Sequence, residues 1–228
     1  MRRIAYALMI LMLLSPAVSA QGFSLGVKGG LFTANTTGVP LGLNNTSFKN
    51  GFAGGVSLGY AFNDYFSLQP EVLYVMKGLD GVVSNRFAAA KFTGAYDYVE
   101  MPILAKLTLA AKSRVSPYVF FGPSLGINVK ADIQIEWAAS RFSEASTETR
   151  DYSSVTNLTE VCLVFGAGLN FAVGRGAITL DGRFDLGLSN VTKGGDLSTR
   201  VGDVERIETV PASTSKNIGF ALLAGYAF

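Results

Sequence analysis

Eight segments of this chain alternate apolar residues with polar or small ones, and the two phases differ in chemistry. The apolar phase runs through residues 23–31, 52–60, 66–76, 99–107, 119–127, 161–171, 178–188 and 218–228. Alternation with a period of two predicts β-strands that have two unlike faces. No position of the apolar phase carries a charge, so one face of every predicted strand is suited to an apolar solvent.

The opposite phase of the same segments holds the charges. Its charged members are Lys28, Glu71, Glu100, Lys106, Glu160, Asp181, Arg183 and Asp185. A Lys or Arg that faces lipid near the membrane centre costs about 2–4 kcal/mol, so in a membrane these side chains must face a lumen. A soluble sandwich would instead bury the large apolar phase and expose a surface rich in Gly and Ala. We therefore predict an all-β fold, an eight-stranded antiparallel transmembrane β-barrel of the up-and-down, OmpA/OmpX-like kind.

The first twenty residues have the pattern of a secretory leader. Arg2 and Arg3 precede an apolar stretch over 4–14, and small residues follow at 18–20. Eleven apolar residues are too few to span about 30 Å of hydrocarbon as a helix. We predict a cleaved signal peptide over 1–20 and a single barrel domain over 21–228.

The predicted connections alternate between short and long. The short ones are 63–64, 110–115 and 173–176, and the long ones are 33–50, 78–96, 130–157 and 190–216. This asymmetry is typical of outer-membrane barrels, which have short periplasmic turns and long external loops. We therefore expect the outer membrane of a Gram-negative bacterium, with both mature termini periplasmic.

Two local features qualify this pattern. The outward phase of the fifth segment continues through residues 131, 133, 135 and 137. This predicts an arm beyond the membrane, with Trp137 as a candidate contact. The alternative is a loop that alternates by chance.

Three prolines, Pro70, Pro102 and Pro123, lie inside predicted strands. Each removes one ladder donor, and we expect β-bulges there.

Three runs carry a family resemblance. They are YVEMPILAKL at 98–107, PYVFFGPSLG at 117–126 and VFGAGLNF at 164–171. Together with the aromatic C-terminus they resemble the PorT-like outer membrane β-barrel family of Bacteroidota. The resemblance implies a fold and a location far more than an activity, although some members of that family are accessory parts of a secretion apparatus.

The C-terminal segment also resembles the signal by which the barrel-assembly machinery recognises its substrates. Phe220, Tyr226 and Phe228 are the candidate contacts in it. Outer-membrane lipid and this machinery are therefore the expected partners, and a further envelope protein is a possible third.

Composition excludes several kinds of chemistry. The chain has no His and one Cys, so a Ser-His-Asp mechanism and a His-ligated metal site are impossible. Without Arg2 and Arg3 its 17 remaining basic residues balance 17 acidic ones, which argues against nucleic-acid binding. We expect no enzymatic activity, no catalytic residues, no metal and no cofactor.

The eight lumenal charges are the candidate functional constellation. In a narrow barrel they would form either a structural plug of salt bridges or a gate that opens by rearranging the pairs. We expect a structural or interaction component of the cell envelope, possibly accessory to a secretion or surface complex. A narrow channel for small solutes or ions is the alternative, and an adhesin that acts through the long loops is a weaker one.

Overall fold

The computed structural model describes residues 22–38, 45–84, 89–110, 113–138, 145–201 and 204–228. The predicted signal peptide over 1–20 lies outside these residues. The strands are β1 (Phe23–Thr37), β2 (Asn45–Ala61), β3 (Phe66–Ser84), β4 (Ala89–Thr108), β5 (Val115–Trp137), β6 (Ser146–Asp151), β7 (Thr159–Val173), β8 (Gly176–Gly187), β9 (Gly195–Val201), β10 (Val204–Val210) and β11 (Lys216–Ala227).

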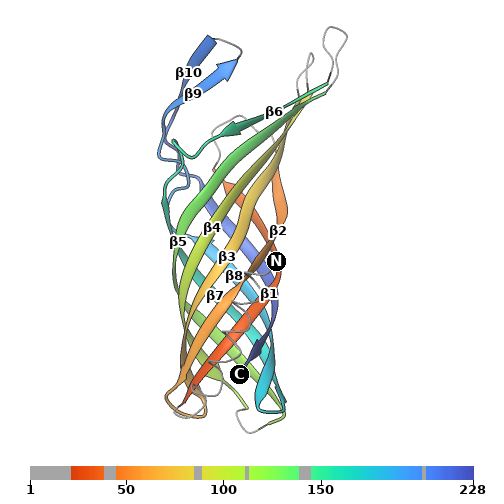
Figure 1. The fold of residues 1–228 in the computed structure, drawn as a ribbon, viewed down its shortest axis with the longest axis vertical. Helices are drawn as coiled ribbons and strands as arrows, with labels where there is room; N and C mark the ends of the chain where they lie inside the picture. Colours follow the sequence, from red (N-terminus) through yellow and green to blue (C-terminus); the bar gives the residue numbers. More distant parts are fainter. Residues whose placement is uncertain (1–21, 39–44, 85–88, 111–112, 139–144, 202–203) are drawn as a thin grey trace, which may run out of the picture.

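Eight of these strands close into an antiparallel barrel. They pair in the order β4-β3-β2-β1-β11-β8-β7-β5, and a β4–β5 ladder completes the circle. Beyond the last ladder pair of β1 and β11, the amide of Phe228 donates a hydrogen bond to the Leu25 carbonyl at 2.7 Å. The predicted fold class is confirmed, and each of its eight segments lies in a barrel strand except for the terminal residues Leu188 and Phe228 (Figure 1).

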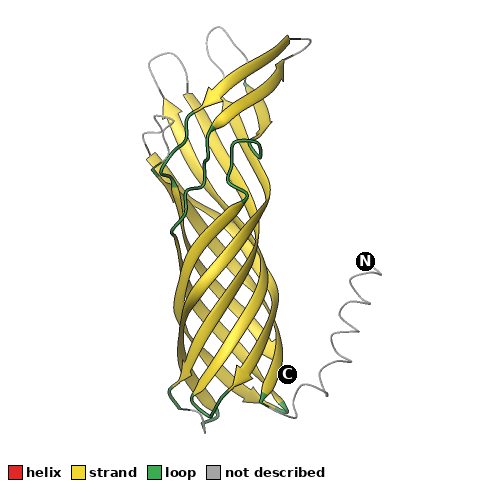
Figure 2. Ribbon diagram, turned by 90° about the vertical axis from the view of Figure 1, so that its left-hand side faces the viewer, coloured by secondary structure: helices red, strands yellow, loops and turns green. Residues whose placement is uncertain are grey.

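The two ends of the barrel differ. At one end, called the turn end, short connections join β2 to β3, β4 to β5 and β7 to β8. The start of β1 and the end of β11 meet there, since Gly26 pairs with Ala227. At the other end, called the loop end, β6 extends the sheet beside β5, while β9 and β10 form a separate hairpin (Figures 1 and 2).

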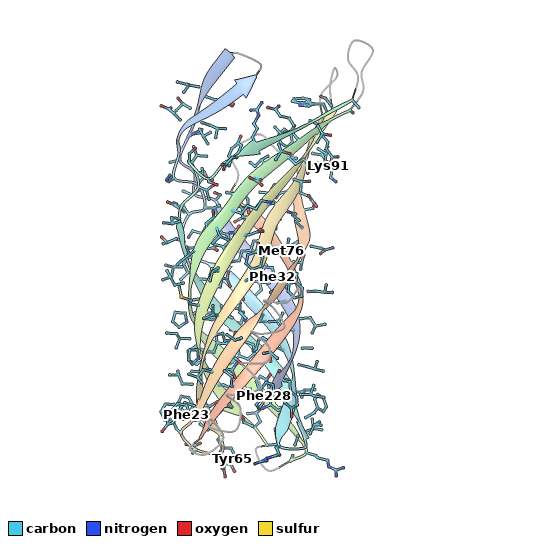
Figure 3. All side chains as sticks on the ribbon, viewed as in Figure 1. Phe23, Phe32, Tyr65, Met76, Lys91 and Phe228 are labelled. Carbon is cyan, nitrogen blue, oxygen red and sulfur yellow. The ribbon has the colours of Figure 1, made fainter. Side chains whose placement is uncertain are left out.

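The outer wall of the barrel is apolar. Leu31, Phe121 and Leu222 are each more than 60% exposed, and large apolar residues recur on the outward face of every barrel strand. Side chains radiate from the wall along its whole length (Figure 3). Such a belt is the surface that lipid requires of a membrane barrel.

No helix among the described residues has the length and apolarity needed to cross a membrane.

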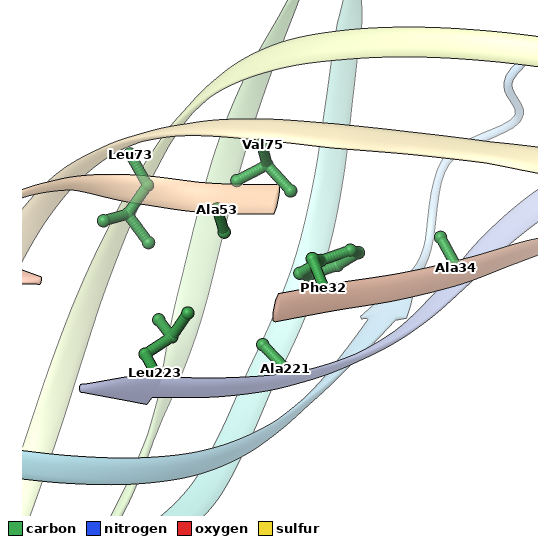
Figure 4. Packing of buried hydrophobic residues seen from close by; sticks show 7 residues of the cluster. All are labelled: Phe32, Ala34, Ala53, Leu73, Val75, Ala221 and Leu223. Atoms are coloured by element: carbon green, nitrogen blue, oxygen red, sulfur yellow. The ribbon is translucent and has the colours of Figure 1, made fainter. Parts of the chain in front are cut away.

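An apolar layer fills part of the interior. Phe32, Leu73, Val75 and Leu223 point into the barrel from β1, β3 and β11, together with the small side chains of Ala34, Ala53 and Ala221 (Figure 4). All lie in the phase opposite to the outward belt. The lumen of an eight-stranded barrel is narrow enough for side chains to fill it.

The three longest strands extend far beyond the predicted segments. β3, β4 and β5 have 19, 20 and 23 residues, although 9–11 residues suffice to cross a bilayer. Much of the predicted 78–96 loop is therefore strand. The alternation of apolar and polar residues is lost in this stretch, because outward positions such as Asp80 and Thr93 are polar there.

A β-bulge on β5 corrects the predicted phase of the arm. Asp97 pairs with Lys130, but the next residue, Tyr98, pairs with Asn128, so Val129 is an extra residue on β5. The insertion turns every later side chain to the opposite face. Ile133 and Ile135 are consequently buried, whereas we expected them to face outward.

The expected bulges at the three prolines are also corrected. The β3–β4 register is the same before and after Pro70, and the β4–β5 register is the same on both sides of Pro102. Pro123 pairs with Leu163 in an unbroken β5–β7 register. Each proline omits a ladder donor without adding a residue, so no shift is needed.

Candidate functional site

All eight charged residues of the predicted set point into the barrel. The side chains of Glu71, Asp181, Arg183 and Lys28 are at most 5% exposed. Glu100, Lys106, Glu160 and Asp185 are buried as well. Most of them belong to one of two groups, which lie at different distances from the turn end along the barrel axis.

The turn-side cluster consists of Lys28, Glu71, Asp181 and Arg183. Lys28 Nζ lies 2.6 Å from Glu71 Oε1 and 2.7 Å from Asp181 Oδ2. Arg183 Nη2 lies 3.0 Å from Glu71 Oε2 and 3.6 Å from Asp181 Oδ2. Two cations and two carboxylates from β1, β3 and β8 thus form a closed four-membered network.

Neutral groups complete this cluster. Gln69 Nε2 donates to Glu71 Oε1 at 2.7 Å, and the Tyr118 hydroxyl donates to Asp181 Oδ1. Lys106 Nζ lies 3.5 Å from the centroid of the Tyr118 ring, which is a cation–π contact. Lys106 is therefore held by an aromatic face on β5, and among the described residues no carboxylate lies within salt-bridge distance of it.

The loop-side cluster is centred on Lys77. Lys77 Nζ lies 2.5 Å from Glu100 Oε1 and 2.9 Å from Glu160 Oε2. Asn217 Nδ2 donates to Glu160 Oε1 at 2.9 Å, and Thr36 Oγ1 donates to Asn217 Oδ1 at 2.7 Å. The cluster therefore joins β1, β3, β4, β7 and β11 across the lumen.

Lys77 was missing from the predicted set. The predicted segment ends at Met76 and the predicted loop begins at Gly78, so Lys77 was assigned to neither. The signal that could have found it was charge balance. The eight predicted residues comprise five carboxylates and three cations, and a buried carboxylate requires a partner.

Asp185 is the least satisfied member of the set. It lies two residues beyond Arg183 on β8, and its charged neighbours belong to both clusters. Its Oδ1 atom has no hydrogen-bond partner in the part of the chain that the structure describes. The lumen thus holds five carboxylates and four cations, with Asp185 as the odd charge.

One group of side chains has the composition of a metal site. Ligand atoms of Glu100, Glu160 and Cys162 lie within 4.8 Å of one another. The Lys77 ammonium lies among them, 3.8 Å from Cys162 Sγ in addition to its two carboxylate contacts. A lysine cation therefore occupies the position that a metal ion would need.

The charged clusters separate two cavities. A polar cavity of about 160 Å³ opens at the turn end and reaches Lys28, Lys106 and Tyr118. An apolar cavity of about 100 Å³ lies at the loop end and reaches Leu79 and Tyr96. No residue lines both cavities, so side chains occupy the lumen between them.

The remaining predicted residues lie on the outer surface. Tyr226 and Phe228 stack edge to face at the turn end, with ring centroids 4.9 Å apart. Phe220 lies six residues further up β11 and contacts Phe184 and Phe48 instead, so it is not part of the same group. Trp137 ends β5 at the loop end and is 41% exposed.

An aromatic row follows the wall near the turn end. Phe23 contacts Tyr60 at 4.7 Å between ring centroids, Tyr60 contacts Phe62 at 4.9 Å, and Phe62 stacks on Phe66 at 5.5 Å. Phe23, Tyr65 and Phe228 all lie near this end (Figure 3). Rings at this level have the position of the aromatic girdle that marks a membrane interface.

Comparison with solved structures returns small outer-membrane proteins. Ail, the attachment invasion locus protein of Yersinia pestis, is 15% identical, with 91% of this chain and 99% of that chain covered and a TM-score of 0.42. Neisserial surface protein A is 16% identical, with coverages of 91% and 96% and a TM-score of 0.45. OprG of Pseudomonas aeruginosa is 10% identical, with coverages of 91% and 97% and a TM-score of 0.45.

Comparison with curated proteins found no match. A protein-family comparison matches residues 19–193 to the outer membrane protein beta-barrel domain. This match covers most of the chain and every strand that contributes to the two charged clusters except β11, which carries Asn217. The chain belongs to the outer membrane protein beta-barrel domain family and is a bacterial outer-membrane β-barrel protein.

Proposed function

We propose that this protein is a non-enzymatic, closed barrel that serves the cell envelope as a structural or interaction component. The observation that carries the proposal is the filled lumen. Buried ion pairs link three barrel strands at the loop side, and hydrogen bonds of Asn217 and Thr36 add two more, while the wall extends past the membrane at one end only. A barrel without a path through it must act through its surfaces.

The two charged clusters act in this proposal as a static plug. Each cation of the turn-side cluster contacts two carboxylates, so opening a path would break several contacts at once. Separating a buried pair leaves uncompensated charge, which is strongly unfavourable. The same constraint makes the plug a device that fixes the register of the strands around it.

The loop end is the external surface in this proposal, and both mature termini are periplasmic. The long strands and the β9–β10 hairpin lie at the loop end, whereas short turns lie at the other. This is the asymmetry typical of outer-membrane barrels. Trp137, exposed at the tip of β5, is then the candidate external contact.

The aromatic end of β11 is the proposed contact for the barrel-assembly machinery. Tyr226 and Phe228 form one half-buried group at the turn end, and Phe220 is the third candidate, higher on the same strand. The PorT-like resemblance further suggests a bacterium of the Bacteroidota and an accessory role in a secretion or surface complex.

In-cell photo-crosslinking tests the proposal of a partner. A photo-reactive residue replaces Trp137 at the loop end or Asn63 in the β2–β3 turn, and the outer-membrane fraction is analysed on a gel. We expect a discrete adduct of higher mass from one of the two sites, and that site identifies the side of the partner. The absence of an adduct from both sites would contradict an interaction role.

A narrow ion path is the second candidate function, and Asp185 favours it. A buried carboxylate whose Oδ1 lacks a partner lies where the two clusters meet, which is where a rearranging gate would need a free acceptor. Under this candidate, Arg183→Ala raises the conductance of the purified barrel in planar bilayers. An unchanged trace would exclude the gate and leave the plug.

A further inference from the structure

The apolar cavity at the loop end has a composition unlike the lumen below it. Its volume is about 100 Å³, and its walls include Leu79, Phe92, Tyr96, Ile133, Tyr152 and Val191. β3, β4 and β5 supply one wall, and the segments that follow β6 and β8 supply the other. The cavity therefore lies between the extended sheet and the base of the β9–β10 hairpin (Figures 1 and 2).

These walls form a packed enclosure. Leu79, Tyr96 and Val191 belong to one buried apolar cluster, and Ile133 belongs to a second, with Tyr152 packed against both. An ordered water needs two to four polar partners, and apolar cavities stay dry and bind small apolar molecules. A cavity of about 150 Å³ accepts benzene. The present one is smaller but open on one side, so it can hold one ring with an edge protruding.

Tyr96 offers a polar contact on the apolar wall, and Thr36, Thr192, Thr209 and Ser215 also line the cavity. Tyr96 is 6% exposed, and no hydrogen bond of its hydroxyl occurs among the described residues. Burial raises the pKa of Tyr96 to about 12, with a smaller contribution from Tyr152. The phenol is therefore neutral at physiological pH and can donate to an acceptor on a ligand.

The rim of the cavity limits the charge of a ligand. Glu208 of β10 lines the opening, and its carboxylate pairs with Arg150 of β6 at 3.4 Å. Arg150 is already held by Glu148, at 2.8 Å from Nε. Because the guanidinium is shared between two carboxylates, the described residues at the rim offer no free cation for an anionic ligand.

We propose that this cavity is a binding site for a small neutral molecule with one aromatic ring and one hydrogen-bonding group. The ring would occupy the apolar volume, and its polar atom would accept a hydrogen bond from the Tyr96 hydroxyl. The charged clusters close the lumen beneath the site, so the molecule is bound and not passed through. The inference does not depend on the presence of a protein partner.

Two matched probes test the proposal on the protein in lipid nanodiscs. Binding of 4-fluorophenol and of fluorobenzene is followed by the chemical shift of the Ile133 side-chain methyl groups. We expect saturable shifts with both probes. Tyr96→Phe should weaken 4-fluorophenol by about three- to tenfold, the loss of one hydrogen bond, and leave fluorobenzene unchanged. Equal shifts in wild type and Tyr96→Phe for 4-fluorophenol would overturn the role of the hydroxyl.

Cavity volume is tested with a second set of variants. Phe92→Ala enlarges the cavity and should admit 2-naphthol, which wild type excludes. Ile133→Phe fills it and should abolish saturable binding, read from the fluorine signal of 4-fluorophenol. Ile127→Phe is the matched control, since Ile127 faces outward on the same strand. Non-saturable fluorine signals that are the same in wild type, Ile133→Phe and Ile127→Phe would mean partition into lipid only, and would overturn the site.

Discussion

The wall of this barrel reverses its polarity between its two ends. On the turn side of Val129, Leu125 of β5 faces outward and Ser124 faces the lumen. Beyond Val129, Ile133 is buried inside and Lys130 is exposed outside. The apolar outward face of the first region suits lipid and the polar outward face of the second suits water, so the same strands carry opposite patterns. The difference shows that the outer solvent, more than the strand itself, determines which phase is apolar.

The strands achieve this reversal in two ways. On β4 the inward phase continues without a shift, and its residues change from Glu100 to Tyr96 and Phe92. On β5 one extra residue, Val129, exchanges the two phases. A change of composition and a change of register thus produce the same result on neighbouring strands.

The largest expected effect comes from removing a shared carboxylate in the lipid-surrounded region. Glu71→Ala removes one of the two carboxylates that Lys28 and Arg183 share, so that Asp181 alone faces both cations. Breaking a buried ion pair by removing one partner costs about 3–5 kcal/mol. Urea unfolding in detergent micelles measures the loss. Glu208→Ala is the control, because its side chain is 61% exposed, and it should cost less than about 1 kcal/mol. Similar losses in both variants would refute the contrast between plug and extension.

A lysine scan of the outer face tests the reversal itself. Leu125→Lys places a cation against lipid and should cost about 2–4 kcal/mol, less if the position lies near the interface. Gln134→Lys on the same strand lies beyond the bulge and should change the free energy of unfolding by less than about 0.5 kcal/mol. Unfolding in lipid vesicles measures both. The contrast fails if Gln134→Lys destabilises as much as Leu125→Lys.

A smaller effect is expected from one neutral group of the plug. Tyr118→Phe removes the hydrogen bond to Asp181 and leaves a buried acceptor with one partner fewer. The expected loss is about 1–3 kcal/mol, measured by the same unfolding assay. Ring packing against Lys106 is kept in this variant, so an unchanged stability would mean that the cation–π contact is the important one.

The smallest effect is expected at the outer tie between β6 and β10. Arg150→Ala removes partly exposed contacts with Glu148 and Glu208, which are worth less than about 1 kcal/mol. Global stability should be unchanged. Amide exchange in β10 should quicken, because the hairpin loses one attachment to the sheet. Slower or equal exchange would show that the tie does not hold the hairpin.

The sequence predicted the barrel well where lipid is the outer solvent. Each predicted segment alternates because one face meets hydrocarbon, and the eight barrel strands contain them all except for the terminal residues Leu188 and Phe228. The predicted inward charges are inside for the same reason. Lys77 was missed because Met76 is the last outward residue before Gly78 ends the pattern, although the strand continues.

The reversal on β5 could not be read from alternation. Ile127, Val129, Ala131, Ile133 and Ile135 are apolar at every second position, so the pattern continues through the bulge without interruption. Length was the available clue, since a strand of 23 residues greatly exceeds what a bilayer requires. A residue inserted between two apolar runs leaves no compositional trace, and only pairing with β4 reveals it.

A nitroxide scan along β5 tests the reversal most directly. Single cysteines at residues 119–136, in a Cys162→Ala background, carry the label in lipid nanodiscs, and accessibility to oxygen and to a water-soluble nickel reagent is measured at each site. The account predicts high oxygen accessibility at odd positions up to Val129, and then high nickel accessibility at even positions from Lys130 onward. Oxygen accessibility that stays high at the odd positions through Ile135 would contradict the account.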